Sequence, residues 1–444
     1  MGLGINRWLS MQLSPSTIID PEGTAAWNTY PLAGASASTI LSRVEDFGWE
    51  AMLDTCYASL ARQIFSERQL FEIVVDIFAN QLHVSVPGEQ WATSPGYIGT
   101  VIRAHAFGKY NDMLIAAMKH PAMLNFLNND ESRKEHVNEN LGRELLELHT
   151  VGIAGGYTED DVKASARILS GRSWQDDLWS QRSTYGAYRY VAEYHWVGPV
   201  TVLGFSHANL TGAGGEAVGD AYLQYLAHHP ATAQKIARTI AVRFVSDQPS
   251  SDLVNRLAAV YLASDTSIVA VVRAVFLSSD FWSSIGTRMR RPLEDAVGAA
   301  RVLNVTRGTQ MREAINWLFW TLDESGHTPF GWVPPNGYPD VAAAWLGAGA
   351  MIQRWNRHRS FVWSGHGFGF TAAKNLAPRR KYMTCQTWVR LAAQRLLGTS
   401  ISEGHVAAIL AGADMVADHP IDSNWWKCGR AAALVLDSPY FQLR

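Results

Sequence analysis

The sequence contains little cysteine. Its 444 residues include 3 cysteines, Cys56, Cys385 and Cys428, and no two of them form a CxxC pair. An odd number of cysteines cannot pair completely. A disulfide scaffold is therefore not expected, and one bridge at most is possible.

The chain also has a small net charge and no long apolar run. The net charge is −2 and charged residues make up 18% of the chain, which excludes the basic surface of a nucleic-acid-binding protein. No apolar run reaches the roughly 18 residues that a membrane span needs. The opening residues, MGLGINRWLSMQLSPS, lack the apolar core of a signal peptide. We predict a globular protein with no nucleic-acid partner and no membrane span, in a compartment that the sequence leaves open.

Several catalytic and metal-binding motifs are absent. The chain has no HExxH motif, no pair of ExxH motifs and no GxSxG motif. These absences exclude the usual signatures of zinc proteases, di-iron bundles and α/β-hydrolases. A carboxylate–histidine metal site made by Glu144, Glu147, His105 and His149 stays open as an alternative. We assign no metal ligand, because His149 falls on the apolar side of its predicted helix, and the sequence identifies no cofactor.

Apolar residues at helical spacing run through most of the chain, for example over residues 37–63, 66–84 and 250–264. We predict an all-α fold in a single large multi-helical domain covering residues 1–444, with the last helices at about 377–444. The exception is the segment at about 185–205, where aromatic and β-branched residues predict a short β-hairpin.

Charged residues concentrate in NENLGRELLELHTVG, residues 138–152. On a helix with about 100° per residue, four of them share one face with Asn140: Glu139, Arg143, Glu144 and Glu147. This face is either solvated, with Arg143 in i,i+4 ion pairs of about 0.2–0.5 kcal/mol each, or it lines a cleft. In a cleft, Arg143 would orient one carboxylate and a drier carboxylate would act as an acid. Glycoside hydrolysis uses such a carboxylate pair.

Local signals predict the ends of other elements. Thr158 and Asp161 have the spacing of a capping box, and Gly171 is placed to end the helix that follows. Residues 329–340, PFGWVPPNGYPD, predict a rigid loop. Its Tyr338 and Asp340 are candidates to rim a pocket, and Asp340 is also predicted to cap a helix that starts at residue 341.

The segment NENLGRELLELHTVG followed by GYTEDDVKASARILSG resembles the signature of a bacterial family, the domain of unknown function 1800. Other segments between about residues 40 and 365 resemble it too, including AHHPATAQKIARTIAVRFVSDQP, RRPLEDAVGAARVL and the 329–340 loop. The resemblance, closest to actinobacterial members, implies a mostly helical fold, an exported protein and a sulfatase-like partner protein, but no established reaction. Neither the export signal nor the earliest family helix is visible, so we expect part of the family's N-terminus to be missing.

The resemblance carries a set of residues to this chain: Arg103, His105, Asn138, Glu139, Asn140, Arg143, Glu144, Glu147, Tyr157, Asp161 and Arg167. The chain departs from many members in two places. Ala79 and Gln81 stand where many members have Trp and His around the residue matching Asn80. Trp196 and Val200 stand where many have Asp and Lys after the residue matching His195. The sequence therefore leaves open whether the protein is an enzyme.

Two functional hypotheses follow. In the first, a hydrolase acts on an envelope or extracellular polymer, with Glu144 or Glu147 as acid or base and Arg143 and Glu139 completing the charged site. In the second, a non-catalytic factor binds a glycan or protein through the hairpin aromatics, although packing of these aromatics on the helices is the alternative. The candidate substrate-binding residues are Arg103, His105, Asn138, Asn140, Tyr194, His195 and Trp196.

Overall fold

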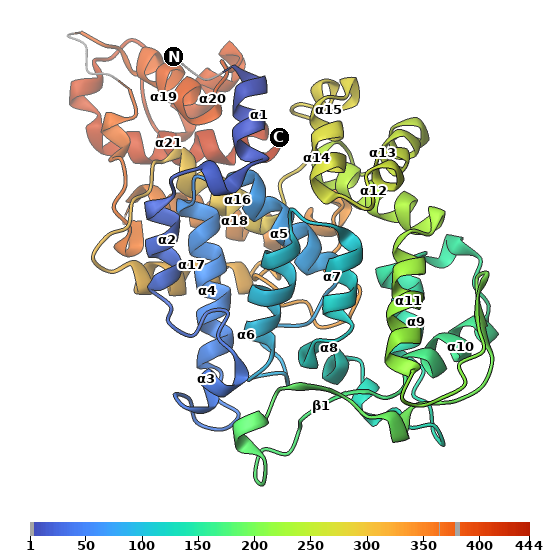
Figure 1. Ribbon diagram of the computed structural model, residues 1–444. Helices are drawn as coiled ribbons and strands as arrows, with labels where there is room; N and C mark the ends of the chain where they lie inside the picture. Colours follow the sequence, from blue (N-terminus) through green and yellow to red (C-terminus); the bar gives the residue numbers. More distant parts are fainter. Residues whose placement is uncertain (1–3, 364, 378–381) are drawn as a thin grey trace.

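The computed structural model describes residues 4–363, 365–377 and 382–444. Over these residues the chain forms twenty-two α-helices and two small antiparallel sheets, which confirms the predicted all-α class (Figure 1). No helix in the described ranges is long and apolar enough to cross a bilayer. Residues 378–381, within the predicted C-terminal helical region, lie outside the described residues. The single domain over residues 1–444 stays a prediction.

Two helices from the first fifth of the chain form the centre of the molecule. Helix α4 (Glu50–Phe65) packs against α2 (Pro21–Asn28), α16 (Pro292–Val302) and α17 (Met311–Asp323). Helix α5 (Gln69–Gln81) lies beside α4 (Figure 1). Helix α5 forms because its apolar residues recur at helical spacing, and Leu70, Val74 and Phe78 are completely or almost completely buried. The other helices of this part are α1 (Ile5–Gln12), α2 (Pro21–Asn28), α3 (Ala37–Leu41), α6 (Ser94–Tyr97), the π-helix η2 (Ile98–Arg103), α7 (Tyr110–Ala117) and α8 (Pro121–Phe126).

The signature segment does not form one continuous α-helix. Helix α9 covers Asn140–Glu144, and a π-helical turn, η4, covers Leu145–His149. A π-helix closes i→i+5 hydrogen bonds, so the spacing of about 100° per residue that we assumed does not hold beyond Glu144. The prediction of a single α-helical face over residues 138–151 is therefore wrong in its second half.

The predicted capping box is confirmed at the start of α10 (Glu159–Leu169). The backbone N–H of Asp161 donates to Thr158 Oγ1 over 3.2 Å, and the backbone N–H of Thr158 donates to Asp161 Oδ2 over 2.8 Å. The helix ends at Leu169, and Gly171 adopts a φ of 88° that favours glycine. Gly171 therefore follows the end of α10, as the sequence predicts.

The strands form two separate two-stranded sheets. Strands β3 (Val200–Val202) and β4 (Phe205–His207) form a hairpin, and β1 (Arg172–Trp174) pairs with β2 (Tyr188–Tyr190). Leu203 and Gly204 at the hairpin turn both have positive φ, as the tight turns of hairpins often require. The predicted hairpin at 185–205 is therefore present at its C-terminal end, whereas residues 188–190 pair with an earlier segment of the chain.

The second half of the chain surrounds the central helices. Helix α12 packs against α5, α13 and α14, while α16 packs against α4 and α18. Helices α19 to α21 pack on one another at the upper left of Figure 1. The bounds are α11 (Gly215–Ala227), α12 (Pro230–Phe244), α13 (Ser251–Ala263), α14 (Ile268–Phe276), α15 (Ser279–Ser283), α16 (Pro292–Val302), α17 (Met311–Asp323), α18 (Ala348–Trp363), α19 (Cys385–Leu397), α20 (Glu403–Gly412), α21 (Cys428–Asp437) and α22 (Pro439–Gln442).

One local prediction is wrong, and the cysteines stay unpaired, which the sequence allowed. The predicted helix cap at Asp340 is wrong, because a short 3₁₀ turn, η8 (Ala342–Trp345), follows and α18 starts only at Ala348. The Asp340 carboxylate instead accepts a hydrogen bond from Arg243 Nε over 2.6 Å. All three cysteines are free and buried, so the single bridge that the sequence allowed does not form.

Candidate functional site

A cavity of about 840 Å³ lies between α5, α12, α13, the turn at residues 148–154 and the loop at residues 336–340. Its volume is in the range of sites that hold small organic molecules. Apolar side chains form much of the wall, among them Ile77, Val151, Val242 and Val254. Residues 148–152 are the end of the segment NENLGRELLELHTVG, so this segment helps to build the cavity.

The loop that closes one side of the cavity is held by Asn80 of α5. The Asn80 amide Nδ2 donates to the backbone oxygen of Tyr338 over 2.9 Å, and Tyr338 N–H donates to Asn80 Oδ1 over 2.6 Å. Gly337 has a φ of 68°, and a Cβ at this position would overlap the backbone oxygen of Asn80. Asp340 lines the cavity as the sequence suggested, whereas Tyr338 is buried against His327.

Buried ion pairs fix α12 against α5 and the loop. Arg243, 3% exposed, contacts Asp76 through Nη1 at 2.7 Å and Asp340 through Nε at 2.6 Å. Arg291 contacts Asp76 at 2.7 Å, and Arg288 contacts Asp340. Burial alone would raise the pKa of Asp76, but the guanidinium groups of Arg243 and Arg291 outweigh it and hold this pKa below its usual value. The cavity therefore has a rigid, charged inner wall.

Lys235 of α12 connects the cavity to the predicted carboxylates. Its Nζ donates to the backbone oxygen of Glu147 over 2.6 Å. Burial lowers the pKa of Lys235 to about 8, although the charges of Glu147 and Glu144 act in the opposite direction. Burial and the charge of Glu147 raise the pKa of Glu144, and Tyr157 donates to Glu147 Oε2 over 3.1 Å.

The four residues Glu144, Glu147, Tyr157 and Lys235 are called the lysine cluster below. Lys235 lines the cavity, whereas Glu144 and Glu147 do not. The charges of Glu144 and Glu147 act on Lys235, and the two carboxylates themselves lie outside the cavity lining.

Arg238 is a second cation on the same wall. It lies three residues after Lys235, so both side chains extend from one side of α12, and both line the cavity. Arg238 is exposed and forms no hydrogen bond or ion pair with any residue in the described ranges, whereas the neighbouring Arg243 is fully paired. The cavity thus presents an uncompensated positive charge.

Arg143 and Glu139 form part of a solvated surface. Arg143 makes two hydrogen bonds with the carboxylate of Glu159 in α10, at 2.8 and 2.7 Å, and a weaker one with Glu139 at 3.3 Å. The side chains of Glu139 and Glu159 are 40% and 67% exposed. Exposed pairs of this kind contribute little to stability. In this structure Arg143 is not the partner of Glu147 that the helical spacing predicted.

Arg103 lies apart from this surface. Arg103 binds both carboxylate oxygens of Glu72 at 2.8 Å, and its guanidinium stacks on Trp27 and Phe71. His105 is half-buried after η2, and its ring has no hydrogen bond with a described residue. The structure therefore places Arg103 in a salt-bridge network on α5, not beside Glu144 and Glu147.

Asn138 and Asn140 organise the start of α9. The backbone N–H of Asn140 donates to Asn138 Oδ1 over 2.9 Å, and the backbone N–H of Asn138 donates to Ser132 Oγ over 3.2 Å. These bonds satisfy polar groups at the helix terminus.

The hairpin aromatics pack against charged side chains. Arg133 stacks on Tyr194 at 3.7 Å and Arg167 on Trp196 at 4.8 Å. His195 is buried, with its ring nitrogens 2.8 Å from Ser170 O and 2.9 Å from Asn209 Oδ1. Trp196 and Glu139 both line a small cavity of about 220 Å³. Glu139 belongs to the predicted hydrolase site and Trp196 to the aromatic residues of the binding hypothesis, so the structure brings one residue of each together.

Sequence reasoning missed Lys235 and Arg238. Both lie in the segment AHHPATAQKIARTIAVRFVS, where cations three residues apart are also typical of an ordinary solvated helix face. Their position at a cavity depends on α5, α13 and the 336–340 loop. His149 is buried as predicted, and its Nδ1 is 3.0 Å from the backbone oxygen of Gln81. No three His, Cys, Asp or Glu side chains in the described ranges are arranged to hold a metal ion.

The family model described as "Protein of unknown function (DUF1800)" matches residues 1–443. No curated protein and no solved structure matches the chain.

Proposed function

Because the chain belongs to the DUF1800 family of proteins of unknown function over almost its whole length, we propose its function from the geometry of the 840 Å³ cavity. The protein binds a small organic acid there, with Arg238 and Lys235 holding the acidic group. The observation that carries this proposal is the pair of cations on α12, of which Arg238 has no partner among the described residues.

The wall of the cavity favours an acid with an apolar body. Lys235 is half-buried, and an ion pair shielded from bulk water is stronger than one in solvent. The exposed guanidinium group of Arg238 can bind a carboxylate through two parallel hydrogen bonds. The neighbouring Ile77, Val151 and Val254 offer no polar partner and contact apolar atoms instead. A ligand with one carboxylate and a hydrocarbon body would satisfy both parts of the wall.

Isothermal titration calorimetry with medium-chain carboxylic acids, and with alcohols of the same chain length, tests this proposal. We expect the acids to bind at least tenfold more tightly than the alcohols. Arg238→Met should weaken acid binding about tenfold or more, since a hydrogen bond to a charged group contributes about 1.5–3 kcal/mol.

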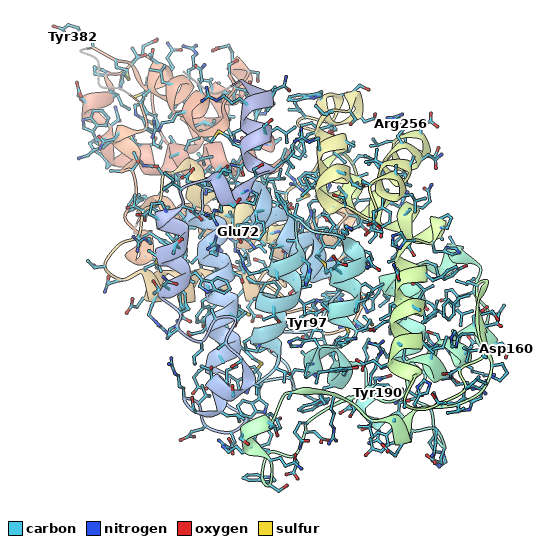
Figure 2. All side chains as sticks on the ribbon, viewed as in Figure 1. Glu72, Tyr97, Asp160, Tyr190, Arg256 and Tyr382 are labelled. Atoms are coloured by element: carbon cyan, nitrogen blue, oxygen red, sulfur yellow. The ribbon has the colours of Figure 1, made fainter. Side chains whose placement is uncertain are left out.

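The control is Arg256→Met, because Arg256 lies on the outer side of α13 (Figure 2) and pairs with Asp280 at 2.8 Å, away from the cavity. This variant should bind as the wild type does. Equal binding of acids and alcohols, or unchanged acid binding by Arg238→Met, would exclude the proposed site.

A second candidate function is catalysis by the lysine cluster. It is favoured by the opposite shifts of two neighbouring groups, since the pKa of Lys235 is lowered to about 8 and that of Glu144 is raised. A lysine and a carboxyl group shifted in this way are suited to exchange protons near neutral pH. A hydrolase that acts on an envelope or extracellular polymer is one such enzyme. Glycan binding and the sulfatase-like partner implied by the family resemblance stay predictions.

Chromogenic esters and glycosides offer an assay for this second function. Glu144→Gln and Glu147→Gln should keep the melting temperature of the wild type and lose turnover. A large fall in melting temperature in both variants would instead assign the two carboxylates a structural role.

A further inference from the structure

Arg243 also lines a second cavity, of about 190 Å³, formed mainly by α5 and α16 and by the side chain of Arg444. Five arginines and three carboxylates line it. Figure 2 marks the region at Glu72, one of the three carboxylates. The lining residues therefore carry an excess of positive charge.

Each of the three carboxylates is already paired. Glu72 is held by Arg62 at 2.7 Å and Arg103 at 2.8 Å. Asp76 is held by Arg243 and Arg291, both at 2.7 Å.

Glu294 contacts Arg291 at 3.2 Å and Arg444 at 2.9 Å. None of the three carboxylates is therefore left to neutralise a further arginine.

Two of the arginines have no carboxylate partner in the described ranges. Arg290 Nε donates to the backbone oxygen of Phe441 over 2.7 Å and its guanidinium stacks on the Phe441 ring. Arg301 Nη1 donates to the backbone oxygen of Ser66 over 3.2 Å. Burial lowers the pKa of both groups, and nearby carboxylates offset this only in part. Both side chains thus keep unused N–H donors at the cavity.

We propose that this cavity binds a small tetrahedral oxyanion through Arg290 and Arg301, beside Arg444, whose buried Nε has no hydrogen-bond partner among the described residues. Free phosphate, free sulfate and the phosphoryl group of a small phosphomonoester share the required chemistry. A guanidinium group forms paired hydrogen bonds with such oxygens. A water molecule occupies about 30 Å³ in the liquid, so the cavity accommodates one such anion with a few waters, but not a larger organic ligand. This site is a different cavity from the 840 Å³ one, although Arg243 lies in the wall of both.

Gly298 of α16 keeps part of this space open. A Cβ at position 298 would lie 3.4 Å from Arg290 Nη1 and 3.4 Å from the Phe441 ring. The substitution Gly298→Val would therefore reduce the cavity without removing any charge. It provides a second variant beside Arg301→Gln, which removes one of the uncompensated cations.

The test is thermal unfolding of the full chain in potassium phosphate, potassium sulfate and potassium chloride at equal ionic strength. Phosphate or sulfate should raise the melting temperature along a saturable curve, beyond the effect of chloride, because a ligand that binds only the folded state stabilises it. Arg301→Gln and Gly298→Val should each need at least tenfold more phosphate for half of the shift. Glycerol phosphate is tested in parallel, to distinguish binding of the phosphoryl group of a phosphomonoester from binding of a free anion.

Arg238→Met, which alters the other cavity, is the control and should keep the phosphate response. The proposal is overturned if chloride gives the same shift, or if both cavity variants respond as the wild type does. It is also overturned if Arg238→Met, and not Arg301→Gln, removes the response. If Gly298→Val does not fold, Arg301→Gln decides the outcome alone.

Discussion

Arginine residues in this protein occupy two kinds of environment. Arg243 is buried and contacts Asp76 of α5 and Asp340 of the cavity loop. Arg143 is partly exposed and binds Glu159 at the surface. Removing one partner from a buried pair leaves an uncompensated charge in the interior, whereas water replaces the partner of an exposed one. The two residues should therefore differ greatly in their effect on stability.

Arg243→Met is predicted to lower the free energy of unfolding by about 3–5 kcal/mol, because Asp76 and Asp340 then lose a buried counter-charge. Urea denaturation at pH 7 measures this change. Arg143→Met is the matched control and should have an effect close to zero. A cost for Arg143→Met as large as that for Arg243→Met would mean that the exposed surface of the signature segment also holds the fold together.

Lys235 should give stability an unusual dependence on alkaline pH. Its pKa in the folded chain is about 8, below the usual lysine value. Above pH 8 the unfolded chain holds a proton on this lysine that the folded chain has released, so this group adds stability as the pH rises toward about 10.4. We expect the stability of the wild type relative to Lys235→Met to increase between pH 8 and 10. A constant difference would show that Lys235 has an ordinary pKa.

At the scale of single elements, the loop at residues 329–340 depends on one close contact. The backbone of Gly337 approaches Asn80, and the Asn80 amide makes two hydrogen bonds with Tyr338. A side chain at position 337 would separate the loop from α5. The shape of the 840 Å³ cavity should therefore depend on Gly337.

Gly337→Ala is predicted to weaken binding in the cavity and to increase cleavage of the loop by proteases. Its positive φ adds strain to the steric overlap, since alanine rarely adopts this conformation. Limited proteolysis and the calorimetric titration measure the two effects. Gly347→Ala is the control, because a Cβ at position 347 meets no atom within 4 Å. Equal behaviour of both variants would show that the contact with Asn80 does not hold the loop.

At the scale of the whole molecule, histidines in different elements are buried in their neutral form. Burial lowers the pKa of His120 and His149 to about 4 and that of His327 to about 3, and it also lowers the pKa of His83. His358 differs, because Asp295 and Asp437 outweigh its burial and raise its pKa to about 9. Because these histidines have different pKa values in the folded and unfolded chain, the free energy of unfolding depends on pH.

Stability should fall as the pH decreases from about 6.5 toward 4. In that interval His83, His120, His149 and His327 take up protons in the unfolded chain before they do so in the folded chain. His358 acts in the opposite direction, and its contribution is lost as the pH rises through about 9. Denaturation at pH 7 and pH 5 tests the acid side, with His149→Gln expected to reduce the difference. A stability that is the same at both pH values would contradict this prediction.

The sequence determined the features that depend on neighbours within a few residues. Helical spacing predicted the all-α class, and the capping box at Thr158 and Asp161 is present as expected. The signature motifs indicated the family that the family model confirms. The sequence could not reveal the π-helical turn at residues 145–149, because no spacing of side chains distinguished it from the α-helix that precedes it.

Only the tertiary structure decided which charged groups meet and where a cavity opens. Asp340 lies 97 residues from Arg243, and Asp76 lies 167 residues from it, yet the three side chains form one buried cluster. Lys235 lines a cavity, and Arg103 pairs with Glu72 rather than with the signature carboxylates. Such contacts depend on the packing of whole helices, whereas helical periodicity and capping depend on the local backbone. For this reason the fold class was predictable from the sequence, and the cavities were visible only in the folded chain.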